Sequence, residues 1–474
     1  MKSPVILAGV LCVLLAAGCA KEEKKLTTNS AEAVAAYNEG VNHTNNFYYT
    51  EARTAFERAI AHDSSFALAW ARLAVLAFNT QNEPEAHEYI ARAIHLATRA
   101  TPREQLIVQM WDRRIHFANT VAAAIADSLI KLYPDDPEMH VFRGLLFEMD
   151  QNLEAAVQQY KKASDLDTSY APAAMQLGYA YSTLNEQDKA VSFMERYIRL
   201  VPGSADPRAS YADLLLRVGR YDEALQQYRQ SLQLKPDYWY AFQQIGFVYR
   251  TLGRLEAAKE QLAKGFAYIP NSRQLEASHV AADADLEARR GRYHEAVQLY
   301  TQAFALDSAN LGASYGMVYA LAELKEFDKA ESMIKNIEKE LERRNLNASQ
   351  AMFGFQLTRA KVLVDEGRLD EARQACQDAL DYSSPITRPS VFRQLAEIAI
   401  RQDAIEEALD ACEQALSVNP NSPDALLTLT KAYHAQGDTR MTREIGNRLL
   451  NLWNEADSDF VRLKELRKLL DLPA

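Results

Sequence analysis

The stretch that decides the fold is residues 205–238, ADPRASYADLLLRVGRYDEALQQYRQSLQLKPDY. Apolar and small side chains recur in it at spacings of three and four, the period of an amphipathic helix. Tyr211 and Leu215 fall on one face of a first helix, and Gly219 then supplies a turn. The inner stripe of a second helix consists of Tyr221, Ala224, Tyr228 and Ser231. Pro236 stops that helix, so the stretch predicts two helices joined by a tight turn.

The same two-helix pattern returns along the chain with a period of 34 residues. Counted from Ala33 in units of that length, the twentieth place holds an alanine in eleven of twelve units. These alanines are Ala52, Ala86, Ala122, Ala156, Ala190, Ala224, Ala258, Ala296, Ala330, Ala372 and Ala408. The twelfth unit has Thr442 instead. Keeping this register needs a few short insertions, the largest being eight residues after Arg344, and the units fill residues 33–456.

Small residues also recur at the eighth place, as Gly40, Gly144, Gly178 and Gly246. Two helix backbones approach closely only where no bulky side chain intervenes, so the eighth and twentieth places should face each other. In period, helix pairing and small-residue pattern the chain resembles the tetratricopeptide repeat family. This resemblance implies an all-α, right-handed superhelical solenoid of about twelve helix-turn-helix repeats with a C-terminal capping helix.

Within this solenoid we expect two arrays of repeats. The N-terminal array covers residues 33–272 with seven units, of which the unit at 103–136 is degenerate. The C-terminal array covers residues 273–456 with five units and an insertion near 345–352. Residues 457–474 carry apolar side chains on one face and basic ones on the other, which predicts a helix that caps the exposed end of the stack.

The N-terminus is typical of a targeting segment. Residues 1–18 combine an early positive charge with an apolar run of 13 residues at 5–17, too short to span a bilayer. The sequence LAAGC at 15–19 resembles the lipobox of bacterial lipoproteins. That resemblance implies a signal peptide over 1–18, a lipidated (palmitate-bearing) Cys19 and a short polar tether over 19–32. The alternative is an ordinary secretory signal in which Cys19 has no role.

If Cys19 is lipidated, the protein is anchored in a membrane of the bacterial envelope. Residue 20 is Ala rather than Asp, so the inner-membrane retention signal known from enteric bacteria is absent. By this resemblance we expect the outer membrane where the cell has one, with the protein facing the periplasm or the cell surface.

Composition and motifs argue against several other classes of function. The chain has only 17 Gly and 15 Pro, which favours helices with short turns, and its net charge of −11 without an extended basic cluster disfavours nucleic acid. Phosphate loops, nucleophile elbows and paired metal-ligand histidines are missing from the sequence. We therefore expect no catalytic residue, no metal and no cofactor. Cys376 and Cys412 occupy equivalent places in consecutive second helices and are predicted to be buried free thiols.

The resemblance also locates a binding surface. In the family the concave groove is lined mainly by the first helix of each repeat, at its second, fifth, ninth and twelfth places. Carried over to this chain, those places give the candidate groove residues Phe78, Met175, Tyr179, Tyr240, Gln243, Phe247, Arg250, Tyr315, Tyr319 and Arg393. Aromatic side chains mixed with polar groups suit a peptide or helix bound in a groove, although any one of these side chains could instead pack against the next repeat.

Two functions follow from these features. The first is a membrane-anchored, non-enzymatic scaffold, monomeric on its own, that binds protein or peptide partners of a cell-envelope assembly. The second is a lipoprotein that captures a glycan, peptide or small molecule for a transporter. Known sugar-binding lipoproteins of this architecture carry large insertions, whereas the largest insertion here is eight residues, so we favour the scaffold.

Overall fold

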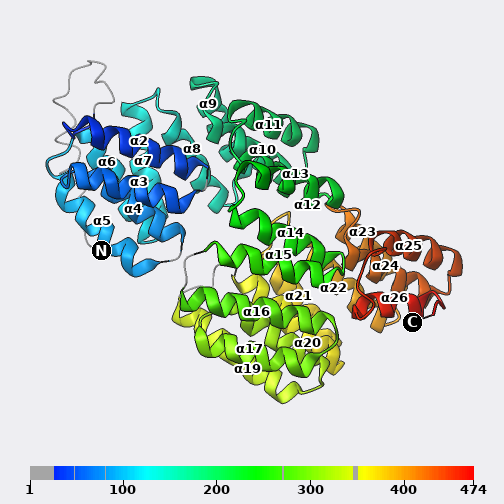
Figure 1. Ribbon diagram of the computed structural model, residues 1–474. Coiled ribbons are helices and arrows are strands. Elements are labelled where there is room, and N and C mark those ends of the chain that lie inside the picture. Colours follow the sequence, from blue (N-terminus) through cyan, green and yellow to red (C-terminus); the bar gives the residue numbers. More distant parts are fainter. Residues whose placement is uncertain (1–25, 47, 81, 270–271, 345–350, 474) are drawn as a thin grey trace. The chain divides into compact units, whose positions relative to one another are not determined.

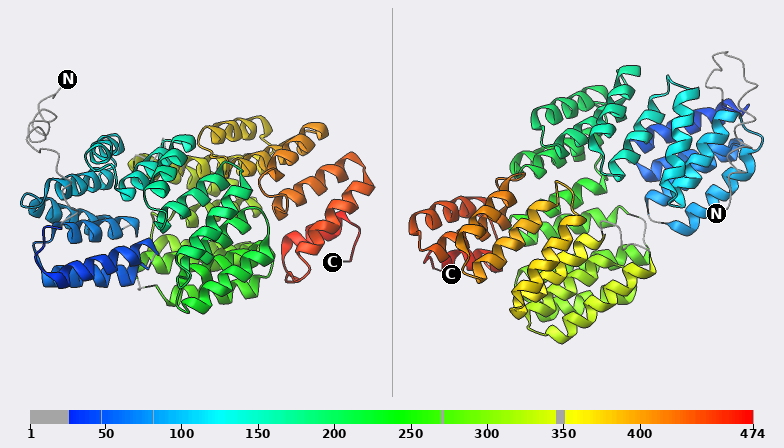
Figure 2. Two further views of the ribbon diagram at one scale, coloured as in Figure 1. Left: turned by 90° about the horizontal axis from the view of Figure 1, so that it is seen from above. Right: turned by 180° about the vertical axis from the view of Figure 1, so that it is seen from behind.

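The computed structural model of the chain describes residues 26–46, 48–80, 82–269, 272–344 and 351–473. These residues form 25 α-helices and no β-strand, which confirms the predicted all-α class. Consecutive helices run antiparallel and lie side by side, as Figure 1 and Figure 2 show. The predicted signal peptide, Cys19 and residues 345–350 of the predicted insertion lie outside the described residues. None of the described helices is long and apolar enough to cross a membrane.

The helices fall into the twelve predicted units, two to a unit. The first helices are α2 (Ala31–Asn45), α4 (Ala67–Asn79), α6 (Pro102–Ile115), α8 (Pro137–Met149), α10 (Ala171–Thr183), α12 (Asp206–Arg217), α14 (Trp239–Thr251), α16 (Arg273–Arg289), α18 (Leu311–Glu323), α20 (Ala351–Glu366), α22 (Arg388–Arg401) and α24 (Pro423–Gln436). The second helices are α3 (Tyr49–His62), α5 (Glu83–Ala97), α7 (Asn119–Leu132), α9 (Leu153–Leu166), α11 (Gln187–Leu200), α13 (Tyr221–Leu234), α15 (Leu255–Ala267), α17 (Tyr293–Leu306), α19 (Phe327–Arg343), α21 (Leu369–Asp381), α23 (Ile405–Leu416) and α25 (Thr439–Leu452). A last helix, α26 (Val461–Leu469), follows.

The small-residue pattern has the packing role predicted for it. All eleven alanines at the twentieth place are fully buried, and Thr442 is nearly so. At the eighth place, a Cβ atom added to Gly40 would lie 2.6 Å from the ring of Phe56, and one added to Gly178 would lie 2.8 Å from Met194 Cε. Neither contact is sterically possible without movement. The glycines therefore let large side chains of the second helix fill the space beside the first.

The turn inside the repeat is built on one left-handed residue at the fifteenth place, wherever the structure describes that residue. In ten described turns this residue has a φ between 57° and 82°. The residues are Phe117, Gln151, Asn185, Gly219, Gly253, Gly291, Lys325, Gly367, Asp403 and Gly437. A left-handed residue just after a helix lets its last carbonyl groups accept hydrogen bonds from the turn. A single residue per repeat reverses the chain, which accounts for the low content of glycine and proline.

Contacts divide the chain into two compact units, residues 1–146 and 147–474. The first is built around a core that includes Phe56, Phe66, Leu73 and Ile90. The described end of the predicted tether packs onto it, because the Thr27 amide donates to Glu104 Oε1 over 3.0 Å. The predicted boundary between the two arrays, at 272/273, lies within the second unit and stays a prediction.

In the second unit, the first helices α16, α18, α20, α22 and α24 contact one another in order, and α26 packs against α24 and α25. The C-terminal end also returns to much earlier repeats. The Asp457 amide donates to the Gly253 carbonyl over 2.9 Å, and its carboxylate accepts from the Glu256 amide over 3.0 Å at the start of α15. Trp453 Nε1 donates to the Thr251 carbonyl over 3.3 Å.

Three consecutive left-handed glycine turns contact C-terminal parts of the chain: Gly219 contacts the loop between α23 and α24, and Gly253 and Gly291 contact the segment at the start of α26. A Cβ atom on Gly219 would lie 2.1 Å from Asn419 Oδ1, one on Gly253 would lie 2.4 Å from the Phe460 ring, and one on Gly291 would lie 2.7 Å from Val461 Cγ1. The predicted capping helix therefore exists as α26, shorter than the predicted range 457–474. Besides packing on the last repeat, it closes the second unit onto the turns of its own earlier repeats.

Candidate functional site

The predicted groove residues lie in five separate places, and one of them is in the first unit. Phe78 of α4 is partly buried, with its ring 5.7 Å from that of Phe117 and the guanidinium of Arg114 4.9 Å from its centre. Phe117 is 65% exposed. Phe78 thus belongs to a small aromatic patch that includes one arginine. The other predicted groove residues all lie in the second unit.

Tyr179 and Tyr240 belong to a buried hydrogen-bonded cluster centred on Asp213 of α12. Both hydroxyls donate to Asp213 Oδ2, over 3.1 and 2.8 Å, and the hydroxyl of Tyr228 donates to Oδ1 over 2.5 Å. Burial raises the pKa of Asp213, and the three tyrosine hydroxyls partly oppose that rise. Met175, one turn before Tyr179 on α10, is buried.

A second buried carboxylate, Asp206, extends this arrangement. It accepts hydrogen bonds from the hydroxyls of Tyr197 and Tyr238 over 2.7 and 2.9 Å. Burial raises the pKa of Asp206 to about 6. We call these groups the tyrosine–aspartate cluster: Asp206, Asp213, Tyr179, Tyr197, Tyr228, Tyr238 and Tyr240. The hydroxyls and carboxylates of the cluster are hydrogen-bonded to one another, so its role is to stabilise the fold.

Gln243, Phe247 and Arg250 of α14 line a cavity of about 490 Å³ together with residues of α15 and α16. Phe247 is 42% exposed, and the guanidinium of Arg250 lies 5.0 Å from the centre of its ring. Arg250 also forms an ion pair of 3.0 Å with Asp285. The structure thus brings Gln243, Phe247 and Arg250 together on one wall of this cavity, and the ring of Phe247 is accessible to solvent.

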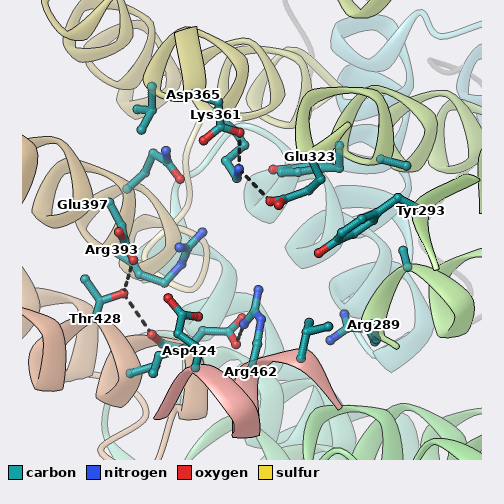
Figure 3. Close-up of a pocket in the computed structure, with 18 of the residues that line it drawn as sticks. Arg289, Tyr293, Glu323, Lys361, Asp365, Arg393, Glu397, Asp424, Thr428 and Arg462 are labelled. Atoms are coloured by element: carbon teal, nitrogen blue, oxygen red, sulfur yellow. Dashed lines mark hydrogen bonds and ion pairs between the residues drawn. The ribbon is translucent and has the colours of Figure 1, made fainter. Parts of the chain in front are cut away.

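Tyr315 of α18 donates a hydrogen bond to the Ala351 carbonyl over 3.2 Å and so links two successive first helices. Tyr319 and Arg393 line a larger cavity of about 660 Å³, which we call the chamber. Its walls come mainly from the first helices α16, α18, α20, α22 and α24, with α26 completing them, and Tyr293 of α17 reaches in from one side (Figure 3).

The chamber is lined by charged side chains of both signs. Its carboxylates are Asp285, Glu323, Asp365, Glu397, Asp424 and Glu465. Its cations are Arg289, Lys361, Arg393, Arg401, Lys431 and Arg462. Five of the carboxylates and five of the cations lie on the first helices α16 to α24, and Glu465 and Arg462 lie on α26. The ninth place of five successive repeats is occupied by Asp285, Tyr319, Lys361, Glu397 and Lys431.

Every one of these carboxylates has a cation within ion-pair distance. Representative distances are 2.9 Å from Arg289 to Asp285, 3.1 Å from Lys361 to Glu323 and 2.8 Å from Lys431 to Glu465. Burial opposes ionisation of Asp285, but the two arginines beside it lower its pKa to about 2. Asp285 is therefore ionised at neutral pH, and each of the six carboxylates has a positive side chain beside it.

Arg393 differs from the other cations of the chamber. Within the part of the chain that the structure describes, it forms neither a hydrogen bond nor an ion pair. Glu397 lies one turn further along α22, but that carboxylate binds Lys431 at 3.2 Å and the hydroxyl of Thr428 at 2.9 Å. Burial lowers the pKa of Arg462 to about 10, and the positive charges of Arg289 and Arg393 add to this effect.

Cys376 and Cys412 are buried free thiols, as predicted. Burial raises the pKa of each to about 12, so neither is a thiolate at neutral pH. Among the described residues, no group of histidine, cysteine and acidic side chains is placed to hold a metal ion.

Comparison with known proteins decides the family. Tetratricopeptide repeat profiles match residues 47–103, 119–171, 171–203, 212–262, 288–352 and 399–441, together more than half of the chain. The chain belongs to the tetratricopeptide repeat family. The matches include the whole unit at 311–344 and part of the degenerate unit at 103–136.

Two proteins of the family show the extent of similarity. This tetratricopeptide repeat protein is 25% identical to anaphase-promoting complex subunit 6 of Arabidopsis thaliana over 198 residues, covering 41% of this chain and 36% of that protein. The chain thus spans about a third of that relative. It is 21% identical over 321 residues to the TPR repeat-containing protein YpiA of Bacillus subtilis (strain 168), covering 61% of this chain and 72% of that one.

Two crystal structures of MamA also align with part of this tetratricopeptide repeat protein. They cover 34% and 35% of this chain and 93% and 91% of their own, with 24% and 23% sequence identity and a TM-score of 0.29 in both cases.

Sequence reasoning missed the residues that α26 contributes to the chamber. Arg462 and Glu465 were expected only on the polar face of a capping helix, whereas both line the cavity. The glycines Gly219, Gly253 and Gly291, which contact C-terminal parts of the chain, were visible as turn residues. A glycine is expected at such a turn in any case, so nothing in the sequence distinguished these three as contact points.

Proposed function

We propose that this tetratricopeptide repeat protein is a non-enzymatic scaffold that holds protein or peptide partners in its groove. The observation that carries the proposal is the continuous contact of five first helices, α16 to α24, in the second unit. Stacked repeats of this kind present equivalent side chains of successive helices to one extended surface. Anaphase-promoting complex subunit 6 is named as a subunit of a complex, which supports a role in assembly.

Two exposed aromatic side chains make the groove suitable for a peptide or helix. Phe247 is 42% exposed and Tyr319 is 37% exposed, and each stands at the ninth place of its repeat. Rigid aromatic groups contribute large contact areas at low cost in conformational entropy and are enriched where partners bind. Arg250 beside Phe247 adds a polar group that can fix the orientation of a bound segment.

We further propose that Cys19 carries the lipid that anchors the protein in the bacterial envelope, with the outer membrane as the expected location. Several acyl chains hold a protein stably, whereas one chain anchors only marginally. In this proposal the anchored protein is monomeric on its own, faces the periplasm or the cell surface, and has no nucleic-acid partner. The LAAGC sequence at 15–19 supports the anchor.

Site-specific photo-crosslinking in cells tests the scaffold. A photoreactive residue at Phe247 is expected to trap a discrete protein adduct of the envelope fraction. The matched control replaces Leu234, which is 41% exposed at the end of the second helix of the preceding repeat. Equal crosslinking from both positions, or none from Phe247, would contradict binding in the groove.

Fractionation of cells tests the anchor separately. Cys19→Ser is expected to move the protein from the membrane pellet to the soluble fraction without changing its circular dichroism. A variant that remained in the pellet would show that the lipid is not what holds the protein.

A further inference from the structure

The chamber of the second unit has the size of the pockets that small ligands occupy. Its volume of about 660 Å³ lies within the range of roughly 300–1,000 Å³ typical of small-molecule pockets. Side chains from six first or terminal helices and from α17 surround it (Figure 3).

The chamber is held in shape by contacts between distant parts of the chain. Arg290 forms an ion pair of 2.7 Å with Asp459, and Arg292 reaches the same carboxylate at 3.2 Å. Arg254 pairs with Glu455 at 2.8 Å. These contacts hold the connection between α25 and α26 against the turns that precede α15 and α17, and so fix the start of α26, from which Arg462 reaches the chamber. The site is therefore formed before a ligand arrives, which lowers the entropic cost of binding.

One of the six cations of the chamber, Arg393, has no direct partner in the described part of the chain, although its charge acts on Glu397 one turn away on α22 and lowers the pKa of that carboxyl. The six carboxylates of the chamber are all ion-paired, while Arg393 has no ion pair and no hydrogen bond among the described residues. Arg462 has one partner, Asp424. In Figure 3 the side chains of Arg393 and Arg462 approach the cavity from α22 and α26. Guanidinium groups in this arrangement repel each other and gain from an anion placed between them.

Two tyrosine hydroxyls without a hydrogen bond among the described residues line the same chamber as these arginines. They belong to Tyr293 and Tyr319. Tyr293 points into the cavity from the opposite side to Arg393 (Figure 3). Tyrosine hydroxyls both donate and accept hydrogen bonds, so they can bind the polar body of a ligand whose anionic group lies at the arginines.

We propose that the chamber binds a small hydrophilic organic anion, with its carboxylate or phosphate group between Arg393 and Arg462 and its polar body against Tyr293 and Tyr319. This ligand site shares Tyr319 with the proposed peptide-binding groove but does not include Phe247. It requires no protein partner and no lipid anchor, so its failure and that of the scaffold are distinguishable.

Calorimetric titration of the full chain carrying Cys19→Ser tests the site. Citrate probes for a carboxylate ligand and inorganic phosphate for a phosphoryl ligand, each against sodium chloride of equal ionic strength. The expected result is saturable binding of at least one probe to the otherwise unchanged protein, weakened at least tenfold by Arg393→Gln. The stronger of the two probes identifies the anionic group of the ligand.

Arg401→Gln is the matched control, because Arg401 lies on the same helix and lines the same chamber. Its guanidinium already binds the Val364 carbonyl at 3.1 Å and Asp365 at 3.4 Å. We expect it to change binding less than threefold. Equal weakening by both variants would show a general charge effect and overturn the site, as would the absence of binding beyond the chloride control. Circular dichroism of both variants confirms that each is folded.

Discussion

The tyrosine–aspartate cluster and the chamber are built from equivalent places of neighbouring repeats. The polar groups of the cluster are hydrogen-bonded to one another, whereas some polar groups of the chamber have no hydrogen bond among the described residues. Tyr179 and Asp213 stand at the ninth place of consecutive repeats and bind each other at 3.1 Å. Tyr319 stands at the same place further along and binds no described group. The buried groups of the cluster bind one another and so stabilise the fold, whereas Tyr319 is 37% exposed and its hydroxyl stays available to a ligand. Position in the repeat alone does not separate the two roles.

The largest expected effect comes from breaking the cluster. Asp213→Ala removes the acceptor of three tyrosine hydroxyls. The expected loss in the free energy of unfolding is about 3–5 kcal/mol, since each stranded hydroxyl costs roughly 1–3 kcal/mol and part is regained by removing a buried charge. Urea unfolding followed by circular dichroism measures it. Asp222→Ala, at an exposed position on α13, should cost less than about 1 kcal/mol. A similar loss in both would contradict a structural role for the cluster.

The second effect concerns pH. The pKa of Asp206 is raised by burial from 3.8 to about 6 in the folded protein, so the folded state binds its proton more tightly than the unfolded state. The stabilisation from this group is full below about pH 4 and is lost as the pH rises to 6. The loss amounts to about 3 kcal/mol.

Asp206→Asn removes the titrating group. The difference in unfolding free energy between the two proteins should therefore shift by about 3 kcal/mol in favour of the variant between pH 4 and pH 7. A difference independent of pH would show that Asp206 titrates normally. No corresponding shift is expected from Asp285 in the chamber over this interval, because two arginines lower its pKa to about 2 despite its burial.

The third effect isolates the closure of the chamber. Gly253→Ala places a methyl group 2.4 Å from the Phe460 ring at a φ of 73°. Gly367→Ala imposes the same backbone strain at a φ of 82°, where no atom lies within 4 Å. We expect a loss of about 1 kcal/mol at Gly367 and of about 2–4 kcal/mol at Gly253. Thermal unfolding compares the two, and equal losses would mean that the returning segment does not rest on Gly253.

The smallest effect contrasts two arginines of the chamber without ligand. Arg393→Gln removes a charge that has no described partner and that acts against Arg462, so stability should stay the same or rise by less than about 1 kcal/mol. Arg401→Gln breaks an existing ion pair and a hydrogen bond and should lower the melting temperature slightly. A larger loss from Arg393→Gln than from Arg401→Gln would assign Arg393 a structural role.

The repeat architecture could be predicted because its determinants are local. An alanine at the twentieth place and a left-handed residue at the fifteenth report packing within one repeat. The closure could not be predicted, since Asp457 and Gly253 are more than 200 residues apart along the chain and their meeting depends on rotations accumulated over many repeats. The same holds for the groove. The resemblance selected both Tyr179 and Arg393. Whether such a side chain is already hydrogen-bonded or can still bind a ligand depends on residues of other repeats, which the pattern within one repeat does not reveal.

A crystal structure of the protein grown in citrate or phosphate would show whether the polar groups of the two regions differ in their availability to a ligand. We expect an anion bound between Arg393 and Arg462, with the Asp213 carboxylate still bound by its three tyrosines and no ligand there. An empty chamber in which Arg393 pairs with Glu397, or an opened cluster, would contradict this expectation.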